Sequence, residues 1–340
     1  AIKHVGGMCT MDILKTLQTL NACHGPSGDE AEVASALEKL AMPFADECRR
    51  DAMGNLIFHK KGNGPKIMFA AHMDSIGCMV THIEKDGFLR FCKVGGLHAG
   101  DLSATPVRFK NGVRGVICVQ KSADPKDLRL DDLYIDIGAH DAEEAAAMVQ
   151  VGDTAVYDTA VYRAGDRLIS PYMDDRIACV ILLMALEQLQ QCSNDLYFVF
   201  TSQEEVGLRG AKTAAYGIDP DYGIAVDVTG TDDEMGSKHT ASSKLGGGAA
   251  IKVMDSSVIC HPQVVSRLKH LAAERGIPAQ MDIIQAGGTD AGAIHTTRIG
   301  VLTGGISVPC RYIHTPQEMV DRGDVEACAR LIAAFAEAQI

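Results

Sequence analysis

Three long apolar segments of this 340-residue chain run without interruption and then end in acidic residues or histidine. They read IMFAAHMD, LYFVFTSQEE and GIAVDVTG, and a fourth segment, VPCRYIHTP, ends in the same way. Continuous apolar strands are typical of a sheet that is covered on both faces. Ligand sites of open α/β sheets lie beyond the carboxyl ends of the strands. The pattern therefore favours an α/β fold in which polar side chains far apart in sequence meet at one edge of the sheet.

Segments between the strands show the periodicity of helices. Apolar residues recur at helical spacing over 11–23, 27–41, 178–190, 261–276 and 324–339. Ser27 and Asp29 are predicted to start the second of these helices, because such residues favour helix N-termini. Together with the strands, these helices predict a mixed sheet between helical layers.

The sequence pattern changes over 76–164, where short segments typical of β-strands are separated by turns that contain glycine. Asp86-Gly87 and Asn111-Gly112 are typical of β-hairpin turns. One helix is expected to open at Asp141, with Glu144 completing a capping box. We therefore predict a catalytic α/β domain over 1–75 and 165–340, with a small β-rich domain inserted between the two parts.

Charge and cysteine content exclude several classes of protein. The chain carries 32 Lys and Arg against 44 Asp and Glu, a net charge of −12, and it has no basic run. This balance disfavours nucleic acids and anionic membranes as partners. No apolar run approaches the ~20 residues that span a bilayer, and the first residues lack the apolar core of a signal peptide. The 11 cysteines are odd in number and form no CxxC, which favours a reduced, cytoplasmic protein.

Seven side chains at strand ends or at a helix start are candidates for a common site: His72, Asp74, Asp174, Glu204, Glu205, Asp227 and His314. Each has an ordinary alternative when taken alone. A histidine after a strand is most often solvated, and an aspartate at a helix start favours the first turn without any further role. The combination of histidines with acids at one predicted edge is what favours a metal site.

Five motifs, AHMDSIG, MDDR, EEVGLRGA, AVDVTG and RYIHTP, occur in this order along the chain. Together they resemble metallopeptidase family forty-two, which comprises the glutamyl aminopeptidases and the tetrahedral-complex (TET) aminopeptidases. The resemblance covers nearly the whole chain, including the inserted domain. It implies a zinc-peptidase-like catalytic domain that removes N-terminal residues from peptides.

The resemblance also implies a set of ligands for two divalent metal ions. His72 and Asp227 would hold one ion, Glu205 and His314 would hold the other, and Asp174 would bridge them. Two ions about 3.5–4 Å apart can hold a water and polarise a carbonyl group together. Mixed nitrogen and oxygen ligands suit zinc, cobalt or manganese, and the sequence does not choose among them.

The remaining polar residues of the motifs receive supporting roles. Glu204 would act as general base and then as general acid. Asp74 would orient a ligand imidazole from behind the metal, and Arg176 is expected to pair with nearby carboxylates.

Two rival readings and the substrate pocket stay open at this point. One rival is a related dinuclear deacylase or carboxypeptidase, and the other is a metal-free, inactive assembly protein.

The family resemblance implies dimers, built with the inserted domain, that assemble into dodecamers. The preferred N-terminal residue is not apparent; segments 229–250 and 286–310 are expected to line its pocket. Gly287, Gly288 and Asp290 are either part of that site or an ordinary loop with a helix cap.

Overall fold

A large mixed sheet organises most of the protein. The computed structural model describes residues 10–189, 192–238 and 241–339. Within these residues the sheet has eleven strands, with the order β1-β2-β12-β3-β13-β16-β17-β11-β10, and β14 and β15 continue from β16. The strands are β1 (Glu47–Arg50), β2 (Leu56–Lys60), β3 (Lys66–His72), β10 (Tyr162–Ala164), β11 (Arg167–Ser170), β12 (Asp195–Thr201), β13 (Tyr222–Gly230), β14 (Ala249–Met254), β15 (Ala279–Ile283), β16 (Leu302–Arg311) and β17 (Glu318–Asp321).

The centre of this sheet is parallel. Strands β12, β3, β13 and β16 are neighbours, and each adjacent pair runs in the same direction. Their carboxyl ends therefore lie at one edge, and Thr201 at the end of β12 is in register with His72 at the end of β3. This arrangement confirms the mixed α/β sheet expected from the apolar segments.

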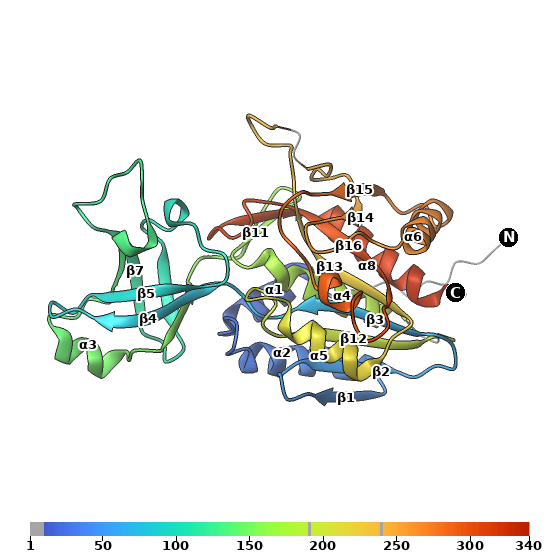
Figure 1. The fold of residues 1–340 in the computed structure, drawn as a ribbon, viewed down its shortest axis with the longest axis horizontal. Helices are drawn as coiled ribbons and strands as arrows, with labels where there is room; N and C mark the ends of the chain where they lie inside the picture. Colours follow the sequence, from blue (N-terminus) through green and yellow to red (C-terminus); the bar gives the residue numbers. More distant parts are fainter. Residues whose placement is uncertain (1–9, 190–191, 239–240, 340) are drawn as a thin grey trace.

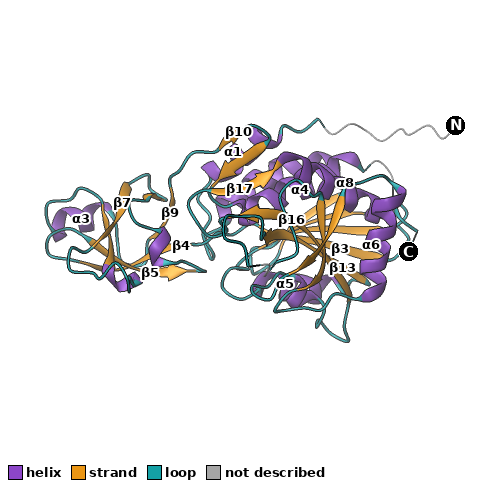
Figure 2. Cartoon of the chain, turned by 90° about the horizontal axis from the view of Figure 1, so that it is seen from above, coloured by secondary structure: helices purple, strands orange, loops and turns teal. Residues whose placement is uncertain are grey.

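Helices cover both faces of the sheet (Figure 2), where α4 and α8 lie on one side and α5 on the other. Along β3, Ile67, Phe69 and Ala71 join the core beneath α4 and α8. Met68 and Ala70, the alternate residues, face α5 and α7 instead. The helices of this domain are α1 (Ile13–Ala22), α2 (Ala31–Ala41), α4 (Met173–Gln188), α5 (Arg209–Ile218), α6 (Pro262–Glu274), α7 (Ala291–Ile294) and α8 (Arg322–Glu337), with a 3-10 helix at Met42–Phe44.

The predicted start of α2 is wrong. The N-cap residue is Glu30, and neither Ser27 nor Asp29 caps the helix. Ser27 Oγ instead donates a hydrogen bond to Asp74 Oδ2 at 2.6 Å. Asp29 forms an ion pair with Lys110 of the inserted segment, at 2.6 Å. Both side chains are engaged in contacts distant in sequence, which local capping rules do not reveal.

A closed β-barrel stands apart from the large sheet, on the left in Figure 1. Gly87 and Gly112 adopt positive φ angles of 85° and 90° in the two predicted hairpin turns. Asp141 caps the barrel's helix by accepting from the backbone N–H groups of Glu143 and Glu144. The barrel has a hydrophobic core of its own. Its elements are β4 (Gly77–Ile83), β5 (Leu89–Val94), β6 (Pro106–Phe109), β7 (Arg114–Val119), β8 (Leu133–Asp136), β9 (Thr154–Tyr157) and α3 (Ala142–Met148), with 3-10 helices at Ala99–Asp101 and Leu130–Asp132.

Strand β10 lies inside the stretch 76–164 but pairs with β11 of the large sheet. The barrel strands themselves run from Gly77 to Tyr157. Among the helices of the described residues, none combines the length and the apolar character that a bilayer crossing requires.

The core beneath the parallel strands is expected to dominate stability. Ile224 of β13 is fully buried, so Ile224→Ala should lower the unfolding free energy by about 2–5 kcal/mol. The same substitution at Ile299, which is fully exposed, should change it by no more than about 0.5 kcal/mol. Chemical denaturation of both variants provides the measurement. Equal destabilisation by the two substitutions would contradict this assignment of the core.

Candidate metal centre

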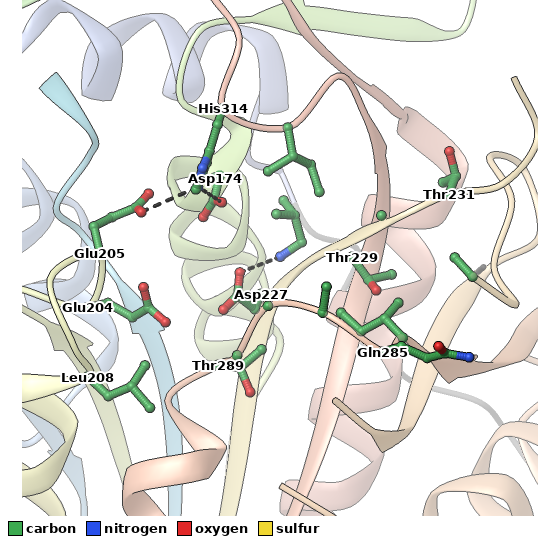
Figure 3. Close-up of a pocket in the computed structure, with 18 of the residues that line it drawn as sticks. Asp174, Glu204, Glu205, Leu208, Asp227, Thr229, Thr231, Gln285, Thr289 and His314 are labelled. Atoms are coloured by element: carbon green, nitrogen blue, oxygen red, sulfur yellow. Dashed lines mark hydrogen bonds and ion pairs between the residues drawn. The ribbon is translucent and has the colours of Figure 1, made fainter. Parts of the chain in front are cut away.

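The polar side chains that follow the parallel strands converge on one cavity at the carboxyl edge of the sheet (Figure 3). Its volume is about 760 Å³. Its lining includes Gly287 and Gly288, together with five of the side chains predicted for the metal site: Asp174, Glu204, Glu205, Asp227 and His314. They come from the start of α4 and from the ends of β12, β13 and β16.

Asp174 lies between two imidazoles. Its Oδ1 atom is 2.8 Å from Nε2 of His72, and its Oδ2 atom is 3.1 Å from Nε2 of His314. Nε2 of His314 is also 3.3 Å from Oε2 of Glu205. The Asp174 carboxylate is therefore shared by two imidazoles whose residues lie far apart in the sequence.

Three overlapping groups of side chains are close enough to hold a cation, with potential ligand atoms within 4.8 Å of one another. They are His72 with Glu204 and Asp227, His72 with Asp174 and Glu205, and Asp174 with Asp175 and Asp227. These groups contain four of the five residues predicted as ligands and the predicted base, and His314 adjoins them through its contacts with Asp174 and Glu205. The chemistry of the set fits a divalent cation, because it combines imidazole nitrogens with carboxylate oxygens.

A bend after β12 allows neighbouring glutamates to share the cavity. Gln203 has a positive φ of 54°, which breaks the alternation that a strand would impose on the next two side chains. The carboxylate of Asp74 holds this bend, because it accepts hydrogen bonds from the backbone N–H groups of Glu204 at 3.0 Å and of Glu205 at 3.3 Å. Asp74 also lies behind His72, whose Nδ1 atom is 3.2 Å from the Asp74 carbonyl oxygen and 3.5 Å from Oδ1.

Burial and mutual repulsion dominate the electrostatics of the site. Burial raises the pKa of Glu204 and that of Asp227 well above their usual values, and neighbouring acids raise them further. Against the effect of burial, the carboxylates of Asp174 and Glu205 raise the pKa of His314 to about 12. Glu205 Oε1 is buried and has no hydrogen-bond partner. A divalent cation fits this set, since it would relieve the repulsion and give that oxygen a partner.

Glu318 was missed by the sequence analysis. Its buried carboxylate accepts from the backbone N–H of Asp174 at 2.9 Å and from that of His314 at 2.7 Å, so it holds the two segments against each other. Asp175 was missed as well, and it accepts from the backbone N–H of His72 at 3.2 Å. Asp175 stands next to a predicted ligand in the sequence, whereas nothing in QEMVD distinguishes Glu318 from an ordinary strand residue.

The inserted segment supplies a wall of the site, which the sequence analysis also missed. A Cβ atom built on Gly96 would lie 2.5 Å from Nδ1 of His314. One built on Gly95 would lie 3.2 Å from Cβ of Glu205. The chain after β5 therefore passes directly over two predicted ligands, and only glycine leaves room for the imidazole.

The predicted partners of Arg176 are wrong. This fully buried guanidinium donates to the carbonyl oxygens of Leu20 at 2.8 Å and Gly25 at 3.1 Å. It ties α1 and the following loop to α4, and it stabilises the helix that begins at the site.

Comparison with known proteins agrees with this geometry. The family model for the M42 glutamyl aminopeptidases matches residues 54–331 of the chain. The chain belongs to this family.

Individual relatives match a larger share of the chain than the family model does. A putative aminopeptidase of Acetivibrio thermocellus is 47% identical over 322 residues, which cover 94% of this chain and 97% of the relative. The structure of an aminopeptidase from the archaeon Desulfurococcus kamchatkensis is 40% identical, with a TM-score of 0.92, covering 96% of this chain and 94% of that one. The Pyrococcus horikoshii TET1 peptidase, which can assemble into a tetrahedron or a large octahedral shell, is 32% identical with a TM-score of 0.88, covering 96% and 100%. The chain is accordingly a hydrolase, a metal-dependent aminopeptidase.

The glycine wall gives a direct test of the site. In Gly96→Ala the new methyl group would displace the imidazole of His314, so metal affinity should fall by about 10–100-fold, as when the orientation of a ligand is lost. Gly100→Ala is the matched control, because a Cβ atom there meets nothing within 4 Å. Competition with a chromogenic chelator would measure both affinities. Wild-type affinity in Gly96→Ala would show that His314 is not a ligand.

Proposed function

We propose that this aminopeptidase hydrolyses N-terminal residues from peptides with two divalent ions held around Asp174. The observation that supports this proposal is the position of the Asp174 carboxylate, with one oxygen next to His72 and the other next to His314. In this arrangement His72 and Asp227 complete one ion site, and Glu205 and His314 complete the other. The donor set suits zinc, cobalt or manganese.

A pair of ions held in this way would polarise the scissile carbonyl and lower the pKa of the attacking water. Glu204 lines the same cavity and is not one of the five proposed ligands. Its carboxylate takes a proton from the water and delivers it to the departing amine, as a general base and then a general acid.

Asp74 acts through the residues around it. Its carboxylate fixes the backbone of both glutamates, and its carbonyl oxygen lies next to Nδ1 of His72, so that Nε2 faces the ions. A hydrogen bond of this kind sets the tautomer and the orientation of a ligand imidazole.

The assembly and the location of the protein are also proposed from its relatives and its cysteines. The likeness to a TET peptidase that assembles into shells, and that has been solved as a dodecamer, supports a homo-oligomer in which dimers assemble to a dodecamer. We assign the catalytic domain to 1–75 and 165–340 and the dimerisation domain to 76–164, whose barrel lies between Gly77 and Tyr157. The cysteines of the described residues, such as the buried Cys78 and Cys179, are free thiols, which supports a cytoplasmic location.

Removal of the base should separate chemistry from metal binding. Glu204→Gln should retain both ions and lose turnover by about 10²–10⁴-fold, because the amide accepts no proton. The kcat for an amino-acyl anilide and the metal content by elemental analysis would be measured together. Glu38→Gln, a surface change in α2, serves as the control. A loss smaller than tenfold would refute the assignment of Glu204.

Removal of the shared carboxylate should affect both ions. Asp174→Ala is expected to bind neither ion tightly, because the two sites have this ligand in common. Asp227→Ala, which removes a ligand from one site alone, should retain the ion held by Glu205 and His314. Isothermal titration of each metal-free variant would give the stoichiometry. Two tightly bound ions in Asp174→Ala would contradict the ligand set.

Recognition of the free amine distinguishes an aminopeptidase from its rivals. The metal-loaded enzyme should hydrolyse leucyl anilide and leave N-acetyl-leucyl anilide intact. Comparison of the two rates under identical conditions provides the measurement. Hydrolysis of the acetylated substrate alone would reverse the conclusion.

A further inference from the structure

The cavity extends well beyond the proposed metal ligands. Figure 3 shows Thr229, Thr231 and Gln285 on the side away from Glu204 and Glu205. Apolar side chains form much of the wall on this side and around it: Leu208, Val228, Ala241, Ile284 and Ile313. A volume of about 760 Å³ exceeds what the ions and a water require, so the cavity has room for a substrate side chain.

Two threonines of this wall, Thr229 and Thr289, have their hydroxyl groups engaged by carboxylates behind it. Thr229 Oγ1 donates to Oδ1 of Asp282 at 2.9 Å, and Thr289 Oγ1 donates to Oδ2 of Asp255 at 3.2 Å. Each hydroxyl has only one proton to donate. These donors are therefore not available to the carboxylate of a substrate.

Cations near this wall are paired as well. Lys252 is almost completely buried, and its Nζ atom lies 2.7 Å from Asp282 and 3.9 Å from Asp255. Arg311 makes a two-pronged ion pair with Asp233, with both distances 2.9 Å. Lys252 and Arg311 are therefore paired with acids, and neither residue lines the cavity.

The described lining contains no Lys or Arg, and its only acids are Asp174, Glu204, Glu205 and Asp227 of the metal centre. A glutamate side chain placed against the far wall would lose its hydration without meeting a cation. A lysine side chain would meet only neutral groups there. Burial of a charge without a partner is strongly unfavourable, whereas an aliphatic side chain gains from leaving water.

Building on the proposed function, we infer that the cavity wall formed by Thr229, Ile284 and Thr289 receives the substrate's N-terminal side chain and selects uncharged aliphatic residues. Leucine and methionine are uncharged aliphatic side chains that can contact the apolar part of this wall. Glutamate is disfavoured because the described lining contains no Lys or Arg, and lysine is disfavoured because the acids of that lining all belong to the proposed metal site.

A panel of amino-acyl anilides tests this specificity. The metal-loaded wild-type enzyme should show a kcat/KM for leucyl and methionyl anilides at least about 100-fold higher than for glutamyl and lysyl anilides, since one misplaced methylene already costs about 10–200-fold. A glutamyl or lysyl preference would overturn the specificity inference and leave the aminopeptidase function intact. Failure to hydrolyse any member of the panel, with metal bound, would instead refute the proposed function on which the inference rests.

Substitutions of opposite charge at Gln285 test whether the substrate side chain lies against this wall. Gln285 lines the cavity and is exposed, so it tolerates substitution. Gln285→Arg should raise the ratio of glutamyl to leucyl kcat/KM at least about tenfold, and Gln285→Glu should raise the lysyl to leucyl ratio in the same way. Gln150→Arg, on an exposed position of the inserted domain, should leave both ratios unchanged. If neither Gln285 variant shifts its ratio, the substrate side chain does not occupy this wall.

Discussion

The concentration of buried carboxylates at one edge of the parallel sheet is the constraint on which the rest of the structure depends. Strands β12, β3, β13 and β16 run in the same direction, so the polar residues that follow them meet. Without a cation their mutual repulsion and their loss of hydration oppose folding, and the two histidines compensate only part of this cost. The architecture is thus one in which binding of divalent ions contributes directly to the stability of the fold.

A second set of acids, outside the proposed ligand set, fixes the main chain of this arrangement. Asp74, Asp175 and Glu318 accept hydrogen bonds from the backbone N–H groups of proposed ligands or of the proposed base. Because these hydrogen bonds fix the main-chain atoms, the proposed ligands can move apart only by rotation of their own side chains. Such support distinguishes a catalytic site, which needs fixed geometry, from an accidental cluster of surface acids.

Much of this organisation could be predicted from the sequence, because it follows from periodic patterns and from residues at strand ends. The apolar strands, the inserted β-rich segment and the convergence of the site all belong to that class, as do the hairpin turns at Gly87 and Gly112. Contacts across long sequence distances could not be predicted. The pairing of β10 with β11, the Ser27 hydrogen bond to Asp74 and the contacts of Glu318 depend on tertiary placement that no local signal carries. For Arg176 a local signal led to a wrong prediction. Because it stands beside acids in the sequence it was expected to pair with them, but it donates to backbone carbonyl oxygens instead.

The glycines that follow β5 belong to the inserted segment in sequence and to the metal centre in space. Gly95 and Gly96 lie against Glu205 and His314, although the barrel whose strands β5 and β6 they connect has a separate core. The barrel is therefore not an appendage that could be trimmed away to leave a minimal peptidase. Deletion of the barrel at its two connections would expose the candidate metal centre to solvent on that side. A different inserted domain would preserve the site only if it placed a comparably narrow segment of main chain at the same position.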